Sequence, residues 1–160
     1  MIRLTIVSGG QTGVDRGALA AALDCGVPCG GWCPAGRQAE DGTVPAIYPV
    51  SSLPGADYEV RTRKNVEDSD GTAIIFDGEL EGGTRFTARL CDATSKPHVL
   101  IDTHALSPTE AAEALAAFLT ENDIRVLNVA GPRASKWPGA HEYTRALLTV
   151  VLGKLGTAAS

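Results

Sequence analysis

The chain has 160 residues, of which 44% are hydrophobic and 21% are charged, and its formal net charge is −5. This composition is typical of one globular domain, which we place at residues 1–156, followed by a frayed tail at 157–160. The acidic balance argues against a general nucleic-acid or membrane surface. No stretch approaches the roughly 20 apolar residues of a membrane span, and no signal-peptide pattern opens the chain, so we expect a cytoplasmic protein.

Strands and helices are predicted to alternate along the chain. Residues 2–8 form a nearly continuous apolar run, as expected of a strand that is buried on both faces. The further predicted strands are residues 27–32, 72–76, 97–101 and 125–130. The predicted helices are residues 13–25, 57–67, 84–94 and 138–152, with another that opens at residue 108. This alternation predicts an α/β sandwich with a mainly parallel sheet of five or six strands.

Two helix starts carry capping signals. Ser107 is followed by a proline at the first helical position and by Glu110 at the third, which is a strong start signal. We expect Thr12 to cap the first helix in a similar way, with Asp15 completing a capping-box-like pair. Gly26 predicts where that first helix ends.

A glycine-rich turn directly follows the first predicted strand. Glycine lets the backbone approach a ligand closely, and a helix start offers free N–H groups to an anion. The turn has the pattern Gly-Gly-x-x-Gly, which is neither a dinucleotide fingerprint nor a Walker loop. The candidate ligand-binding residues are Gly9, Gly10, Gln11, Thr12, Gly13, Asp15 and Arg16. The alternative is a tight strand-to-helix turn that needs glycine for its geometry alone.

A second glycine turn opens the helix that follows the strand at 72–76. Gly82, Gly83 and Thr84 would present backbone N–H groups and a hydroxyl to a phosphate, and Thr87 lies one helical turn further. Nearby arginines could pair with an anion or with neighbouring glutamates. Two such turns in one small domain predict a site for a phosphorylated small molecule.

The topology predicts that these turns meet. Ligands of parallel sheets bind outside the carboxyl ends of the strands, near the point where the strand order reverses. The loops after the first, third and fifth strands hold residues 9–15, 77–87 and 131–136, and all must lie on that edge. The irregular segment at 33–52, which is longer than most loops, leaves from the same edge.

Polar side chains on the second predicted helix are candidates for hydrogen bonds to a heteroaromatic ligand. Thr62, Asn65 and Ser69 share one face, and Arg61, Asn65 and Asp68 form a neighbouring stripe. The alternative is a face that contacts only solvent.

The loop at 36–42 could act as a mobile cover. Arg37 would meet an anion, and Glu40 and Asp41 could accept hydrogen bonds from a base-like ring. The alternative is a solvated, acid-rich surface loop.

Arg133, with Ser135 and Lys136, could complete a cationic rim, or these residues could serve solubility alone. The three histidines are scattered without an evident partner, and no nucleophile–base pair is predicted.

The four cysteines are expected to be reduced thiols rather than metal ligands. Their spacing and the distant histidines fit no common zinc pattern. We expect Cys25 and Cys29 to be packed and Cys33 to lie in a loop.

Several of these segments resemble the molybdenum cofactor carrier proteins of the Rossmann-like SLOG superfamily, which also holds the YpsA-related and LOG (lysine-decarboxylase-like) proteins. The resemblance is carried by residues 6–19, 30–37, 39–42, 61–62, 65–66, 68–72 and 82–84. It is close over residues 2–89 and loose over the remainder. It implies a Rossmann-like three-layer α/β/α sandwich.

The resemblance also implies a homo-oligomeric carrier, a dimer or tetramer, that holds and protects the molybdenum cofactor. That ligand is a pterin with a dithiolene-bound metal and a terminal phosphate. The glycine turns would hold the phosphate, polar side chains would hold the pterin edge, and the dithiolene rather than the protein would bind the metal. Molybdoenzymes would be the recipients of the cofactor.

Two other functions stay open. The hydrolytic relatives, which cleave nucleoside monophosphates, have the pattern Pro-Gly-Gly-x-Gly-Thr followed closely by a catalytic glutamate. The turn at Gly82 lacks the third glycine and that glutamate, which favours binding over phosphoribohydrolase activity. A hydrolase would have to use Glu40 or Asp41 as its base. The third function is a nucleotide-derivative sensor that acts through a partner protein.

Overall fold

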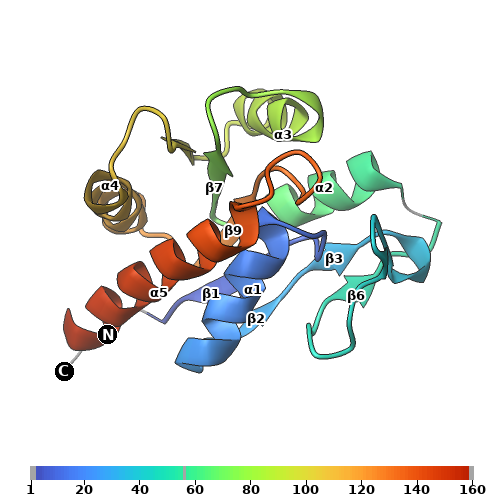
Figure 1. Ribbon diagram of the computed structural model, residues 1–160, viewed down its shortest axis with the longest axis horizontal. Helices are drawn as coiled ribbons and strands as arrows, with labels where there is room; N and C mark the ends of the chain where they lie inside the picture. The colour runs from blue at the N-terminus through green and yellow to red at the C-terminus, as the bar shows by residue number, and fades with distance from the viewer. Residues whose placement is uncertain (1–2, 56, 159–160) are drawn as a thin grey trace.

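A parallel five-stranded sheet forms the middle layer of the protein, seen in a computed structural model that describes residues 3–55 and 57–158 (Figure 1). In spatial order the strands are β2 (Cys29–Gly30), β1 (Thr5–Val7), β9 (Val126–Ala130), β7 (Gly71–Phe76) and β8 (His98–Asp102). Every neighbouring pair is parallel. The predicted α/β class and parallel sheet are confirmed, with five strands.

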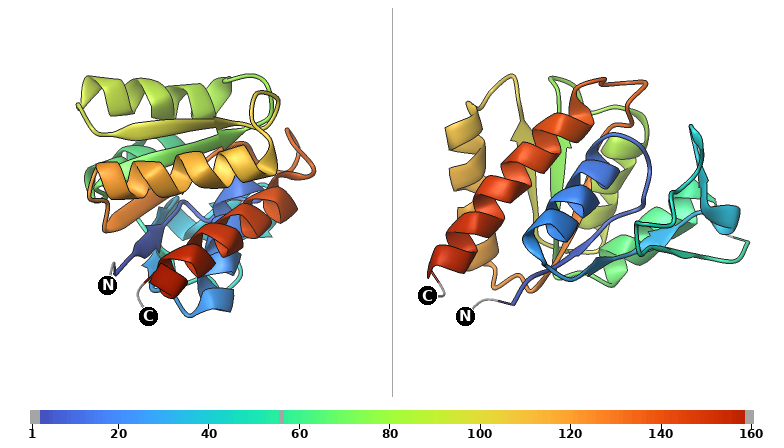
Figure 2. Two further views of the ribbon diagram at one scale, coloured as in Figure 1. Left: turned by 90° about the vertical axis from the view of Figure 1, so that its left-hand side faces the viewer. Right: turned by 60° about the horizontal axis from the view of Figure 1, so that its bottom comes forward.

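Helices cover both faces of this sheet and make it a Rossmann-like three-layer sandwich (Figure 2). One face carries α1 (Val14–Cys25), α4 (Pro108–Glu121) and α5 (Ala140–Ala158), and α5 contacts both of the others. The opposite face carries α2 (Tyr58–Glu67) and α3 (Gly82–Ala93). The division follows from right-handed crossovers, because α1 and α4 connect strands in one direction across the sheet and α2 and α3 in the other.

The segment between β2 and α2 is not wholly irregular. It contains β3 (Trp32–Cys33) paired with β6 (Ser51–Ser52), and a hairpin of β4 (Gln38–Ala39) and β5 (Gly42–Thr43) after a short 3₁₀ turn at Ala35–Arg37. These pieces project beside the main sheet (Figure 2).

The predicted strand at 27–32 is wrong as a single element, because Gly31 divides it with a φ of 128°. A Cβ on Gly31 would lie 2.1 Å from the Ser8 carbonyl oxygen, so only glycine fits this turn.

The ends of the chain also differ from the predictions. The strand predicted at 2–8 is three residues long, Thr5–Val7, and residues 1 and 2 lie outside the described part. The frayed tail was predicted from residue 157, but α5 continues to Ala158, and residues 159 and 160 lie outside the described part.

The core lies on both sides of the central strands. All six residues of β7 are buried, whereas in β1, which was predicted to be buried on both faces, only Ile6 is fully buried. On one face, α1 and α5 approach closely at Gly17, where a Cβ would lie 2.6 Å from the carbonyl oxygen of His141. This close approach brings the start of α1 against the loop that enters α5, and both segments line the site described below.

One capping prediction is confirmed and one is wrong. Ser107 and Glu110 form a reciprocal capping box at α4. At α1 the N-cap is Gly13 and no side chain caps the helix. The Thr12 hydroxyl bonds to Glu40 and accepts from the Ala134 N–H instead, because those partners are brought in by tertiary structure.

The cysteine prediction is wrong in two places. Cys25 is exposed at the end of α1, whereas Cys33 is fully buried in a small cluster with Leu19, Val44 and Val50. In the described ranges, no helix combines the length and apolarity needed to cross a membrane.

Candidate functional site

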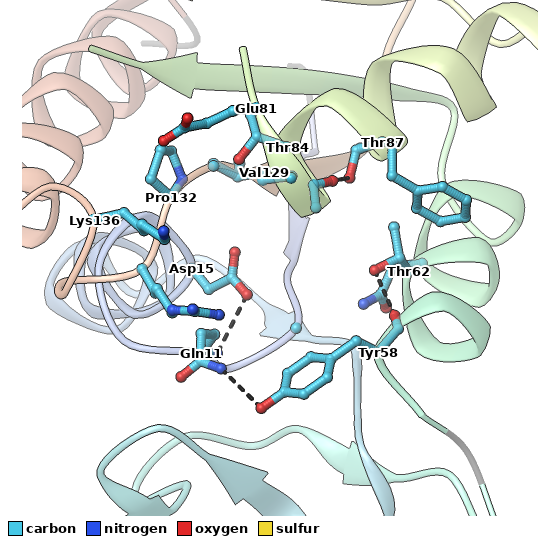
Figure 3. Close-up of a pocket in the computed structure, with 18 of the residues that line it drawn as sticks. Gln11, Asp15, Tyr58, Thr62, Glu81, Thr84, Thr87, Val129, Pro132 and Lys136 are labelled. Carbon is cyan, nitrogen blue, oxygen red and sulfur yellow. Dashed lines mark hydrogen bonds between the residues drawn. The ribbon is translucent and has the colours of Figure 1, made fainter. Parts of the chain in front are cut away.

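A cavity of about 730 Å³ opens at the carboxyl ends of the central strands, a volume in the range of small-molecule sites. The loops after β1, β7 and β9 form three of its sides and α2 forms the fourth (Figure 3). The predicted meeting of the loops at 9–15, 77–87 and 131–136 at one edge of the sheet is therefore confirmed, whereas the segment at 33–52, which was predicted to converge with them, contributes no residue to the cavity lining.

Ten of the predicted binding residues line this cavity. They come from both glycine turns, from α2 and from the loop before α5: Gly9, Gln11, Asp15, Thr62, Asn65, Gly82, Gly83, Thr84, Thr87 and Arg133. Their position agrees with the prediction, and their contact with a ligand remains a prediction.

The other eight predicted residues do not line the cavity: Gly10, Thr12, Gly13, Arg16, Arg37, Glu40, Asp41 and Ser69. They serve the scaffold around it. Gly10 and Gly13 have φ values of 77° and 84°, and a Cβ on Gly13 would lie 2.4 Å from the Pro132 carbonyl oxygen. The buried Ser69 hydroxyl donates to the Val66 carbonyl at 3.0 Å.

Both cations of this group are used inside the protein. Arg16 forms a two-pronged pair with Asp41, at 2.6 and 2.8 Å, and its Nε donates to the Gly10 carbonyl. Arg37 donates to four backbone carbonyls in the segment 44–50 and thereby holds that segment in place. Neither guanidinium is positioned to meet a ligand anion in the cavity.

Glu40 joins three separate segments at the edge of the site. It bonds to the Thr12 hydroxyl, the Ser135 N–H and hydroxyl, and Arg133, whose Nε lies 3.2 Å away. Desolvation acts to raise the pKa of Glu40, but the bonds from Ser135 and Thr12 and the Arg133 charge outweigh it and hold the pKa below its ordinary value.

Backbone N–H groups of the first glycine turn, which were predicted to bind an anion, donate to acceptors within the protein. The Gln11 N–H donates to Asp15, the Thr12 N–H to the Gln11 side chain, and the Val14 N–H to Pro132. Asp15 thus holds the position at the start of α1 that a ligand anion would take. This end of the cavity presents a carboxylate.

The second glycine turn has the opposite character. Glu81 precedes α3 without capping it, and the described residues supply no acceptor for the N–H groups of Gly82 and Gly83. A Cβ added at Gly83 would meet nothing within 4 Å. Exposed first-turn amides at a helix start form a site for a single phosphate or carboxylate.

Arg61 lies beside Asp15 and is the most buried cation in the cavity wall. Its side chain is 13% exposed, its Nη1 lies 3.5 Å from Asp15 Oδ2, and its guanidinium packs against the Tyr58 ring. Its buried Nε has no hydrogen-bond partner within residues 3–55 and 57–158. A Cβ on Gly9 would lie 1.7 Å from Nη1, so Gly9 is needed to admit this guanidinium.

Five carboxylates and three cationic side chains line the cavity. The carboxylates are those of Asp15, Glu59, Asp77, Glu79 and Glu81, and the cations are Arg61, Arg133 and Lys136. This balance disfavours a polyanion and suits a ligand with one phosphate and several N–H donors.

The sequence did not single out several lining residues. Tyr58, Asp77, Phe86, Asn128 and Trp137 belong to this group. Tyr58, at the start of α2, was a recognisable aromatic at a predicted helix end, but its direction depends on how α2 packs on the sheet. Asn128 was a polar residue inside an otherwise apolar strand, which was the available signal.

Two histidines have carboxylate partners that the sequence did not reveal, and the first is His98, whose Nε2 lies 3.9 Å from Asp92 Oδ1. His104 Nε2 lies 3.0 Å from Asp77 Oδ1, and the Thr103 hydroxyl donates to the same carboxylate. His104 is largely exposed and does not line the cavity. In the described part of the chain, no three histidine, cysteine or acidic side chains form a group that could hold a metal ion.

Comparison with known proteins identifies the family to which this chain belongs. Residues 6–152 match the circularly permutated YpsA SLOG family. The chain belongs to that family. A crystal structure of a protein named putative molybdenum carrier protein, from Syntrophus aciditrophicus SB, is similar at 45% identity and a TM-score of 0.92. The match covers 94% of this chain and 96% of the other, whereas no curated protein matches.

In this member of the circularly permutated YpsA family, segments from the first and last parts of the matched region lie side by side in the site. The turn after β1 and the loop after β9 both line the cavity, and β1 and β9 are neighbours in the sheet. The predicted membership of the SLOG superfamily, with its YpsA-related proteins, is confirmed.

Proposed function

We propose that this protein binds the molybdenum cofactor, or a closely similar phosphorylated pterin, in the cavity and releases it unchanged. The observation that carries the proposal is the opposite hydrogen-bonding character of the two glycine turns. Asp15 offers an acceptor at one, and the N–H groups of Gly82 and Gly83 offer donors at the other. A pterin with a terminal phosphate has the complementary pattern.

The contrast between the acceptor at the first glycine turn and the donors at the second also supports a position for the phosphate. The α3 turn would hold it through backbone amides, with the Thr84 hydroxyl beside them, and Arg133 and Lys136 from the β9–α5 loop lie on the cavity wall. The molybdenum would stay on the dithiolene of the cargo. The name of the similar protein from Syntrophus aciditrophicus supports this ligand class.

Release without turnover is favoured over hydrolysis. The hydrolase alternative would use Glu40 or Asp41 as its base, but neither lines the cavity. Glu40 is held by Thr12 and Ser135, and Asp41 by Arg16, so both carboxylates are committed to the scaffold.

The test is mass spectrometry of small molecules released from freshly purified protein, with molybdenum analysis of the same sample and transfer to an apo-molybdoenzyme. We expect a phosphorylated pterin, molybdenum in proportion to it, and activation of the recipient. Protein from cofactor-producing cells that holds no pterin and binds none when it is added would refute the proposal. Free base released from AMP would support the hydrolase instead, and binding without transfer or turnover would support the sensor.

A further inference from the structure

The side chain of Asp15 is an unusual element of the cavity wall. The residue is only 3% exposed, yet its carboxylate points into the cavity (Figure 3). Oδ2 accepts the Gln11 N–H at 3.2 Å and lies 3.5 Å from Arg61 Nη1. A carboxylate with so little access to water gains from every further N–H donor, and the open direction is the one that a ligand would approach.

Gln11 connects Asp15 to a hydroxyl with the opposite role. Its Oε1 accepts two backbone N–H groups, from Thr12 and Glu40, which fixes the orientation of the amide. Its Nε2 therefore donates to the Tyr58 hydroxyl, at 3.2 Å. Because the Tyr58 oxygen accepts this bond, its own hydrogen is left to donate toward a ligand.

We propose that Asp15 and Tyr58 select a ring edge that carries an amino group and a ring N–H next to a carbonyl. This is the 2-amino-4-oxopyrimidine edge that pterins share with guanine. Asp15 accepts from the two nitrogen donors, and the Tyr58 hydroxyl donates to the carbonyl. The proposal rests on the proposed function and specifies how its ligand is recognised.

The geometry gives the ring a defined direction. In Figure 3, Gln11 and Tyr58 lie on the opposite side of the cavity from Thr84, which belongs to the α3 turn. A ligand whose ring edge meets Asp15 therefore directs its substituent toward the amides of Gly82 and Gly83. Adenine, or a ring with a carbonyl in place of the amino group, would place an acceptor or no donor opposite the Asp15 carboxylate.

The matched probes are 6-hydroxymethylpterin phosphate and the corresponding lumazine phosphate, in which a carbonyl replaces the 2-amino group. The wild-type protein should bind the pterin at least about tenfold more tightly in calorimetric titration, as expected for loss of a hydrogen bond to a charged group. GMP and IMP form a second pair that differs only in the amino group. Tighter binding of GMP than of the pterin phosphate would assign the site to guanine.

Two variants separate the roles. Asp15→Asn should reduce the preference for the pterin over the lumazine to about threefold or less. In asparagine an NH2 donor replaces one of the two carboxylate oxygens that accept hydrogen bonds. Tyr58→Phe keeps the ring and removes the hydroxyl, so it should weaken both pteridines by about tenfold and leave the preference between them unchanged. Thermal melting of each variant checks folding, and the wild-type preference needs no variant at all.

Equal binding of the two pteridine phosphates by the wild-type protein would overturn this inference and leave the proposed function intact. An Asp15→Asn variant that keeps the full preference would overturn it as well. Failure of the wild-type protein to bind either pteridine would refute the proposed function and the inference together, and that result is distinct from equal binding.

Discussion

Substitution of Gly83 by valine tests the proposed position of the phosphate at the start of α3. The φ of Gly83 is not positive, unlike the 53° of Gly82, and the added Cβ meets nothing within 4 Å. The side chain would therefore occupy cavity space over the free N–H groups without disturbing the backbone. Loss of one hydrogen bond to a charged group costs about 1.5–3 kcal/mol, which corresponds to a loss of about 10- to 150-fold in affinity.

The fold should not suffer. Glycine is a poorer helix former than valine by about 0.5 kcal/mol or less, so the melting temperature should stay within about 2 °C of wild type. Thr109→Val is the matched control, because Thr109 holds the same second position in α4, is exposed, and lies outside the cavity.

The assay compares 6-hydroxymethylpterin phosphate with 6-hydroxymethylpterin by calorimetric titration. We expect the wild-type and Thr109→Val proteins to favour the phosphorylated ligand, and the Gly83→Val protein to bind both forms about equally. A folded Gly83→Val protein that retains the full preference for the phosphate would refute the placement of the anion at α3.

Four other outcomes are expected. Gly17→Ala should lower the melting temperature by about 2–10 °C, because its Cβ would lie 2.6 Å from a carbonyl of α5 and overpacking costs about 1–3 kcal/mol; an unchanged melt would contradict the close helix contact. Arg37→Met should speed proteolysis of residues 44–50 while leaving ligand affinity within about twofold, since Arg37 lies outside the cavity. Glu40→Gln should destabilise the protein at pH 7. Because the pKa of Glu40 in the folded state lies below its ordinary value of 4.5, this difference in stability should begin to shrink as the pH falls below about 4.5 and should vanish once the pH is below the folded-state pKa. Burial raises the pKa of Asp15 despite the opposing charge of Arg61, so affinity for a 2-amino-4-oxopyrimidine should decline on acidification at a pH above the usual aspartate range, and a flat pH profile would count against Asp15 as the acceptor.

Local signals predicted the fold well, and non-local contacts explain most of the errors. The capping box at Ser107 was predictable because both partners lie within one turn of α4. Thr12 carries a similar signal, but its partners Glu40 and Ala134 are distant in sequence and determine its direction. The burial of Cys33 likewise depends on the packing of the segment that follows it.

The site was predictable to the extent that topology determines it. Strand order brings the loops after β1, β7 and β9 together whatever their side chains do. Topology does not determine whether a cationic side chain points into the cavity or donates to a backbone carbonyl. That direction depends on which acceptors the folded chain leaves free. Arg37 was assigned to a ligand and binds backbone oxygens, whereas Tyr58 was passed over and lines the cavity.

The central place of β9 has a consequence for biosynthesis. Residues 126–130 insert between β1 and β7, so until they leave the ribosome the nascent chain holds two sheet fragments with no shared hydrogen bonds. The part of the cavity wall between the two glycine turns forms only when β9 inserts between β1 and β7. The cavity can therefore form only after β9 has been synthesised, and a product that ended before β9 would have both turns but no cavity between them.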